Sequence, residues 1–412
     1  MEEGIQPKTE QVEVPYGLPR EVKYCNKCVI SNQRPRAKKS EFKHNANSLT
    51  ETIDFDEEGI CAACRYHDKK RIEIDWEQRE KLLWQLCDKH RRNDGLHDCI
   101  VSGSGGKDSV MVAHLLKYKY KMNPLTVTWA PHMYTDVGWR NMQHWIDAGF
   151  DNILFHPNGR VHKLLTRLAF ENLLHPFQPF ILGQKNLAPK IAAKFDIPLV
   201  FYGEPGVEYG DPGSDGAQRK KHYHTGTDYE EMCLGGAPIK ELIEKYGASM
   251  TDLKAYLPID PEEYDRKGIQ VHYLGWYVRW DPQEAYYYAV ENIGFEANSE
   301  RTEGSYSKYS SIDDKSDPFH YFTQLVKFGL GRATYDAAQE CRNNKITREE
   351  AVVLVKKFDQ EFPKKYFQEF LDYMGITEEK FWECIEKFRN KNLWELVDGV
   401  WKLKKPVWSG EK

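Results

Sequence analysis

The stretch Cys99-Ile100-Val101-Ser102-Gly103-Ser104-Gly105-Gly106-Lys107-Asp108-Ser109 decides the fold. Its first three residues are apolar and predict a short buried strand, and the apolar spacing from Ser109 to Tyr120 predicts a helix. Residues 102–109, here called the phosphate loop, join the two. Glycine lets a backbone approach a phosphate closely, and the free N–H groups at the start of a helix bind anions. The pattern therefore predicts an anion site between a strand and a helix.

Strands and helices alternate on the carboxyl side of this stretch. Helices are predicted over Gly138–Ala148 and between Val161 and Phe195, the latter interrupted near Pro176 and Pro179. Such alternation predicts an α/β fold with a parallel sheet covered on both faces, whose ligands bind at the carboxyl ends of the strands. Three further strands are expected: Leu125–Trp129, Asn152–His156 and Pro198–Tyr202.

The flanking regions differ in composition and suggest three domains. Residues 1–75 form an N-terminal arm and a cysteine-bearing module, 76–256 the sheet domain, and 257–412 a helical, aromatic C-terminal region that closes over the substrate. A helix is expected over Asp75–Arg91. The long loop 205–228 carries His222 and His224, which either bind a ligand or are solvated, and long loops are often lids.

Composition excludes several classes of protein. The 412 residues are 40% hydrophobic and 29% charged, and the net charge of −5 gives no global attraction to nucleic acid. The local exception, Lys23 to Lys43, includes Lys38 and Lys39 and is typical of a solvated loop. The sequence has no apolar run of about 18 residues and no apolar leader, so we expect a cytoplasmic protein without a membrane span.

Four of the nine cysteines form two tight pairs. Cys25 with Cys28, and Cys61 with Cys64, supply four thiolates, which suit a closed tetrahedral zinc site in a zinc-ribbon-like module. The alternative is sulfur transfer, with one pair as a redox carrier. Cys233 is expected to be a loop thiol, whereas the other cysteines are expected in the core: Cys87, Cys99, Cys341 and Cys384.

The phosphate loop is not a Walker A motif, because Asp108 follows Lys107 where Ser or Thr is required. It resembles the SGGxDS signature of the PP-loop ATP pyrophosphatases. That resemblance implies that Ser102, Gly103, Ser104, Gly105, Gly106, Lys107, Asp108 and Ser109 hold the pyrophosphate end of ATP with Mg²⁺. Trp129 and Gly203-Glu204 follow other strands, where such enzymes contact the nucleotide. Core packing of Trp129 and a helix cap at Glu204 are the alternatives.

Further segments resemble the bacterial N-acetyl sugar amidotransferases, which are implicated in acetamidino sugars of O-antigen lipopolysaccharide and flagellin glycans. The segments that carry this resemblance, over about residues 20 to 400, are GICAACR (59–65), the phosphate loop, FYGEPG (201–206), YSSIDDK (309–315) and FGLGRAT (328–334). It implies that ATP adenylylates the acetamido oxygen of a nucleotide-linked sugar and that ammonia then replaces AMP.

The same resemblance implies partners and catalytic residues. Position 2 is Glu, and the segment around Cys233 lacks a GxCxG elbow, so a separate glutaminase with an ammonia-conducting subunit is expected. Lys107, Asp108, Lys315 and Arg332 are the expected catalytic residues. A surface role is the alternative for Lys315 and Arg332. The same alternative applies to the neighbouring polar residues Asp314, His320 and Lys327, and to Gln184-Lys185-Asn186, which could form a ligand-facing turn.

Two other functions would use parts of this sequence. A tRNA-modifying PP-loop enzyme, which thiolates or lysylates a base, would use the basic stretch and the aromatic residues for RNA, but the overall negative charge argues against it. A zinc-bound scaffold without ATP turnover would not need the intact loop from Ser104 to Ser109.

Overall fold

The computed structural model describes residues 15–36, 45, 47–211, 215–228 and 231–410. Lys38 and Lys39 of the basic stretch, and most of the expected N-terminal arm, lie outside the described residues. Within the described ranges, no helix is long and apolar enough to cross a membrane.

The core is a five-stranded parallel sheet with the order β3-β2-β1-β4-β7. The strands are β1 (Cys99–Ser102), β2 (Pro124–Trp129), β3 (Asn152–Phe155), β4 (Leu199–Tyr202) and β7 (Gln270–Tyr273). The α/β prediction is confirmed, and four of the strands lie where the sequence predicts them. The fifth, β7, lies in the region expected to be helical, because its sequence QVHY is short and half polar.

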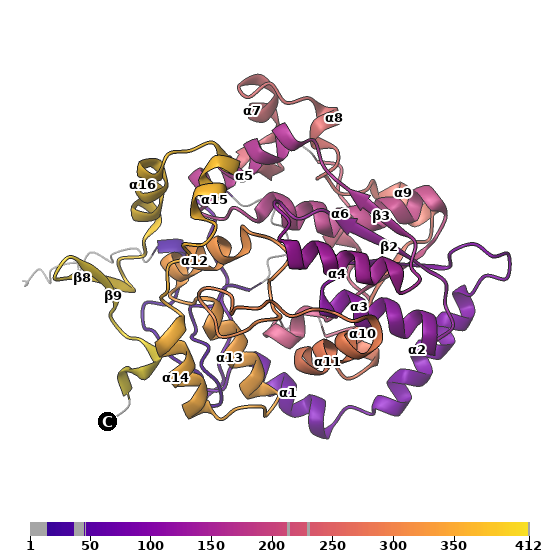
Figure 1. The fold of residues 1–412 in the computed structure, drawn as a ribbon, viewed down its shortest axis with the longest axis horizontal. Helices are drawn as coiled ribbons and strands as arrows, with labels where there is room; N and C mark the ends of the chain where they lie inside the picture. Colours follow the sequence, from indigo (N-terminus) through magenta and orange to yellow (C-terminus); the bar gives the residue numbers. More distant parts are fainter. Residues whose placement is uncertain (1–14, 37–44, 46, 212–214, 229–230, 411–412) are drawn as a thin grey trace, which may run out of the picture.

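Helices cover both faces of this sheet, as Figure 1 shows. Ile100 faces a cluster built mainly from α5 (Gly159–Leu173) and α6 (Gln178–Phe195). Val101 faces the opposite cluster, with α3 (Lys107–His114), the π-helical turn η3 (Leu115–Lys119), α4 (Asp136–Asp147) and α11 (Pro282–Ile293). The break near Pro176 is confirmed. The expected turn at residues 184–186 is wrong, because these residues lie inside α6, whose helical periodicity continues through them.

The cysteine module contains few regular elements before α1 (Ala62–Ile72) and α2 (Trp76–His90), which begins after the N-cap Asp75 as predicted. Its apolar residues share one cluster with α13 (Arg332–Arg342), α14 (Arg348–Phe358) and η7 (Val407–Gly410). In Figure 1 the indigo N-terminal segment accordingly lies beside these orange and yellow helices. The two ends of the chain therefore share a core.

The C-terminal region is helical, as expected. Stacked phenylalanines such as Phe319 and Phe370, with ring centroids 4.4 Å apart, join its helices to Phe170 of α5. The elements are α12 (Asp317–Phe328), α13, α14, α15 (Phe367–Met374), α16 (Glu378–Phe388) and the hairpin β8 (Trp394–Val397) and β9 (Val400–Leu403). This packing fixes α12 and α13 beside the sheet domain.

The long loop is hydrogen-bonded to the sheet near Arg219. It contains the short helices η4 (Gly206–Tyr209) and η6 (Lys221–Tyr223), and Arg219 N donates to Val271 O of β7 at 2.7 Å. Beyond it, Cys233 is buried in β5, so the expectation of a loop thiol is wrong. The remaining small elements are η1 (Pro15–Gly17), β5 (Cys233–Leu234), β6 (Ala237–Pro238), α7 (Ile239–Glu244), α8 (Met250–Leu253), α9 (Pro261–Arg266) and α10 (Leu274–Tyr277).

Candidate functional site

The sheet has one topological switch point, between β1 and β4. From these two neighbours the chain continues outward in opposite directions, through β2 and β3 on one side and β7 on the other. Ligands of open parallel sheets bind in the crevice at such a point, beyond the carboxyl ends of the strands. The phosphate loop follows β1, and Gly203-Glu204 follow β4. The two predicted segments therefore meet where the topology favours a ligand.

The phosphate loop lies against α4. Gly105 has φ +80°, and a Cβ there would come within 2.8 Å of the Met142 Cα, so this position requires glycine. Gly106 is the N-cap of α3, and Ser109 Oγ donates to Gly106 O at 2.9 Å. The loop is thus held close to α4, with the first N–H groups of α3 at its end.

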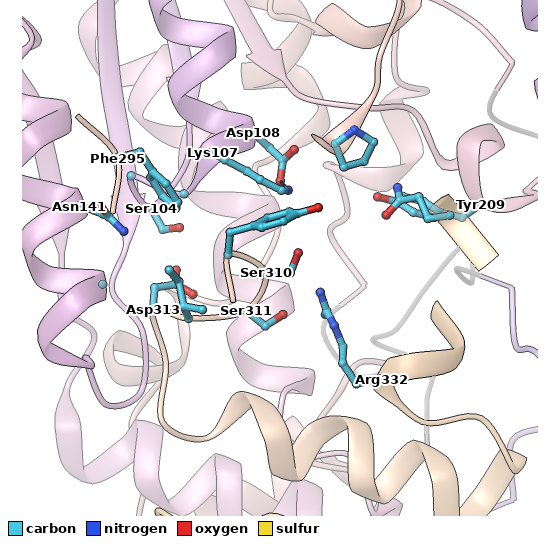
Figure 2. A pocket seen from close by; sticks show the side chains of 17 residues that line it. Ser104, Lys107, Asp108, Asn141, Tyr209, Phe295, Ser310, Ser311, Asp313 and Arg332 are labelled. Carbon is cyan, nitrogen blue, oxygen red and sulfur yellow. Dashed lines mark hydrogen bonds and ion pairs between the residues drawn. The ribbon is translucent and has the colours of Figure 1, made fainter. Parts of the chain in front are cut away.

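A cavity of about 280 Å³ lies against this loop, and we call it the phosphate-loop cavity. Its walls include the loop residues 104–108, Asn141 of α4, Tyr209 of η4, and a later segment comprising residues 309–313 with Arg332. Figure 2 shows the Arg332 guanidinium pointing into the cavity from the wall opposite Lys107 and Asp108. The cavity therefore has cationic groups on two sides.

Two carboxyl groups interact beside the loop. Burial, and then the charge of Asp108, raise the pKa of Glu204 to about 7. Tyr209 donates its hydroxyl to Glu204 Oε1 at 2.5 Å. Asp108 forms an ion pair with Lys107 at 2.5 Å, and its Oδ1 is buried without a hydrogen-bond partner. Neighbouring carboxylates that repel each other fit a hard divalent cation such as Mg²⁺, which prefers oxygen ligands.

The opposite wall carries its own charged residues, Arg332 and Asp313, and two further carboxyl groups interact with Arg332 from outside the lining. Arg332 forms an ion pair with Asp336 at 3.0 Å, one helical turn further along α13. Burial raises the pKa of Asp317 to about 7, against the lowering effect of Arg332. Burial likewise raises the pKa of Asp313, although a hydrogen bond from Ser104 of the phosphate loop opposes the shift. Asp313 thus connects the later segment directly to the loop.

Several predicted residues lie away from this cavity. Lys315 forms an ion pair with Glu369 at 2.6 Å and lines neither of the two cavities described in this section. Asp314 is a buried acceptor for the backbone N–H of His132, at 2.6 Å, and thereby fixes the chain after β2. Trp129 is 3% exposed and packs on Gly183 and Tyr256. This is the core packing that was the alternative to nucleotide contact.

A second cavity, of about 390 Å³, adjoins the first, and we call it the basic cavity. The two cavities share three lining residues: Tyr209, Arg332 and Gln339. His320 and Lys327, both singled out in the sequence, line the basic cavity. It also contains Arg34, from the N-terminal module. A ligand that fills both cavities would therefore touch all three expected domains.

The four predicted metal ligands come together. The sulfurs of Cys25, Cys28, Cys61 and Cys64 all lie within 4.8 Å of one another and are buried. Two of the sulfur pairs, Cys25–Cys64 and Cys28–Cys61, are each 3.8 Å apart. Zinc–sulfur bonds of about 2.3 Å in tetrahedral geometry place sulfurs about 3.8 Å apart, so the donor set fits zinc. His224 is not part of this group; it is buried, and its Nδ1 lies 3.3 Å from Lys185 O.

A buried charged group joins the cysteine module to the phosphate-loop cavity. Glu208 pairs with Lys70 at 2.6 Å and with His67 at 2.9 Å. Both partners lie on α1, one and two turns beyond Cys64, whereas Glu208 precedes Tyr209. Burial lowers the pKa of both Lys70 and His67, and Glu208 opposes this shift. Because a buried carboxylate is costly without partners, this contact fixes η4, and hence Tyr209, on the cysteine module.

Sequence reasoning missed several of the lining residues. Asn141 and Tyr209 lie in a helix and a loop without any motif. Ser310, Ser311 and Asp313 belong to a segment that the sequence linked to a family but not to a site. A weak signal existed for Arg34, because it lies in the basic stretch next to a cysteine pair.

The fold and the site define a parallel α/β protein with an anion-binding type of loop at its switch point and a buried four-thiol cluster. The comparisons add a more particular likeness. Residues 303–407 match the family described as LPS biosynthesis protein WbpG-like, C-terminal domain. This match supports a role in lipopolysaccharide sugar biosynthesis, and it includes Asp313, Lys327 and Arg332.

The chain is also similar to an uncharacterized protein of Methanocaldococcus jannaschii. The two are 33% identical over 75 residues, which cover 18% of this chain and 26% of that protein. The match thus spans about a quarter of the relative's length and carries no function with it.

Proposed function

We propose that this protein is an ATP-dependent amidotransferase of the PP-loop type, which converts an acetamido group of a nucleotide-linked sugar into an acetamidino group. One observation carries the proposal. The phosphate loop and the wall formed by residues 309–313 and Arg332, which belong to the segment matched by the lipopolysaccharide-biosynthesis family, line the same cavity. A loop suited to ATP and a segment linked to sugar biosynthesis thereby meet at one site.

The first step would activate the amide. The acetamido oxygen attacks the α-phosphorus of ATP, the bond to the β-phosphate oxygen breaks, and pyrophosphate leaves. The backbone N–H groups at the start of α3 and Lys107 would hold the pyrophosphate oxygens, and Arg332 would face them from the other wall. Asp108 and Glu204 would hold Mg²⁺, which neutralises phosphate charge when bound.

The second step would introduce nitrogen. Ammonia attacks the imidate carbon, the bond from that carbon to the AMP oxygen breaks, AMP leaves, and one proton is released as the acetamidinium forms. We propose that a separate glutaminase with a conducting subunit supplies the ammonia. The sequence offers no glutaminase elbow, and Cys233, the cysteine considered for that role, is buried in β5. Zinc at the four cysteines would be structural, because four thiolates leave no open position.

The experiment is a product assay by mass spectrometry. The chain is supplied with ATP, Mg²⁺, ammonium and a panel of UDP- and CMP-linked acetamido sugars. We expect AMP, pyrophosphate and a product 1 Da lighter than the acetamido sugar, because NH replaces O. The rate should rise with pH as free ammonia increases, and glutamine alone should give no product until a glutaminase is added.

Two results would contradict the proposal. AMP formation that needs tRNA and no sugar would favour a tRNA-modifying enzyme. Product formation from glutamine with the isolated chain would remove the separate glutaminase, while leaving the rest of the proposal intact.

A further inference from the structure

The basic cavity has an excess of positive charge that is not balanced inside the protein. Its lining includes four arginines and one lysine but a single carboxylate, Asp336. This occurs in a chain with a net charge of −5. Arg332 and Arg36 have carboxylate partners, Asp336 at 3.0 Å and Asp54 at 2.5 Å. The remaining cations therefore decide what the cavity binds.

Lys327 is buried without a counter-ion. The residue as a whole is 4% exposed. Its ammonium donates to Leu173 O at 2.7 Å and lies over the rings of Tyr16 and Phe328. No carboxylate within the described ranges forms an ion pair with it. Burial lowers the pKa of Lys327 to about 7. An ammonium has three donors, so two N–H bonds are not used by Leu173.

Arg34 is the second such cation. Its guanidinium lies over two tyrosine rings, 5.6 Å from the centroid of Tyr209 and 5.5 Å from that of Tyr335. Burial lowers the pKa of Arg34, and no carboxylate in the described part of the chain forms an ion pair with it. Tyrosine rings close to a guanidinium restrict its orientation, and a hydrogen bond with Tyr335 uses only part of the five donors of Arg34.

Arg342 has a different explanation. It also lines the basic cavity, and its Nε and Nη1 have no hydrogen-bond partner. However, the thiolate charges of Cys28, Cys64 and Cys61 raise its pKa, so it lies in the field of the cysteine cluster and is offset by that charge. Lys327 is thus left without an internal counter-charge, and Arg34, for which the charge of Cys61 only partly opposes the effect of burial on its pKa, has no carboxylate partner in the described chain.

The position of the basic cavity indicates which molecule would bring the anion. It shares Tyr209, Arg332 and Gln339 with the phosphate-loop cavity. A molecule in the basic cavity can therefore extend toward the place where the α-phosphate of ATP would lie. Three tyrosines in its lining, Tyr209, Tyr321 and Tyr335, offer flat surfaces for a sugar or a base.

We infer that the basic cavity is the acceptor subsite of the proposed reaction, and that Arg34 and Lys327 bind an oxyanion group of the acceptor, a phosphate or a carboxylate. This inference rests on the proposed function for the identity of the acceptor. The anion supplies the missing counter-charge to both cations, and charge-assisted hydrogen bonds of this kind are among the stronger polar contacts in proteins. The N-terminal module thereby contributes a specificity-determining residue, Arg34, to a site otherwise built from the C-terminal region.

The test is calorimetric titration of the full chain, saturated with Mg²⁺ and α,β-methylene-ATP so that the nucleotide site is filled. The three probes are UDP, UDP-N-acetylglucosamine and glucuronate.

The variants Arg34→Gln and Lys327→Met each remove one charge and keep most of the side-chain volume. Lys240→Met, whose lysine is a surface residue of α7, is the matched control. Each loss should weaken probe binding by about 10- to 100-fold, as expected for a hydrogen bond to a charged group. The analogue should bind all variants with similar affinity.

The probes distinguish the source of the oxyanion. Binding of UDP and UDP-N-acetylglucosamine that is sensitive to both variants assigns the contact to a diphosphate, whereas sensitive binding of glucuronate assigns it to a carboxylate. Unchanged binding in both variants, or no binding of any probe to the wild type, overturns the inference. Failure of wild-type protein to bind the ATP analogue would instead sink the proposed function. Because the two variants lie in different modules, misfolding of one leaves the other to decide.

Discussion

The two adjoining cavities are built in opposite ways. One wall of the phosphate-loop cavity is a continuous stretch of sequence, and its cations, Lys107 and Arg332, already have carboxylate partners. The basic cavity draws residues from positions as distant as Arg34 and Arg342, and three of its cations, Arg34, Lys327 and Arg342, have no carboxylate partner in the described chain. The phosphate loop is therefore preorganised locally for a recurring ligand, whereas the basic cavity depends entirely on how three regions pack together.

The largest effect is expected from a change in the phosphate loop itself. Asp108→Ala removes a proposed Mg²⁺ ligand and the partner of Lys107, and we expect pyrophosphate release to fall by about 10²–10³-fold or more. A coupled pyrophosphate assay measures this. Asp147→Ala, at an exposed position on α4, is the control and should retain activity. Normal pyrophosphate release by the Asp108 variant would remove the basis for treating this cavity as the ATP site.

The contrast between the cavities also explains what the sequence can predict. The strand, loop and helix around Gly105 are local, so their periodicity and glycines predicted the sheet and one wall of the site. The thiol cluster was predictable because CxxC pairs have a fixed spacing.

The parts that were not predictable depend on tertiary packing. Strand β7 is only four residues long and is recognised as a strand through its pairing with β4. Tyr209 reaches both cavities because Glu208 is fixed by α1, a contact between residues 138 positions apart in the chain. Lys315 is a lysine that could bind a ligand by its residue type, but the fold pairs it with Glu369. No local pattern distinguishes such a lysine from Lys327.

A variant of the cysteine cluster should affect ligand binding in the two cavities to different extents. Cys61→Ser should lose zinc, which we expect at one ion per chain by metal analysis of freshly purified protein. Metal binding contributes folding free energy to such modules. Because this module carries Arg34, binding of a nucleotide sugar should weaken by at least about 10-fold, while binding of the ATP analogue changes less. Cys384→Ser, in the separate core of α16, should retain zinc. Absence of both zinc and iron from the wild type would refute the metal site.

The smallest expected effect concerns stability, and it tests whether the basic cavity is maintained at a cost. Lys327 has a pKa of about 7 in the folded protein, lowered from 10.5 by burial. The nearby groups do not offset its charge, since His320, whose pKa is lowered to about 3, is neutral and Arg332 is cationic. Between pH 7 and 10.5 the unfolded chain binds one more proton than the folded chain at this residue. Lys327 therefore destabilises the fold fully below pH 7, and this penalty fades as the pH approaches 10.5.

Lys327→Met should therefore raise the free energy of unfolding at pH 6 by about 1–4 kcal/mol, the range seen when buried ionic groups are replaced by apolar ones. Denaturant titrations at pH 6, 8 and 10 should show that advantage shrinking as the pH rises, and Lys240→Met should show no such trend. A gain in stability together with weaker binding of the acceptor would mean that the lysine is retained for binding. A loss of stability at every pH would mean that Lys327 serves the fold, through its bond to Leu173 and its packing on Tyr16.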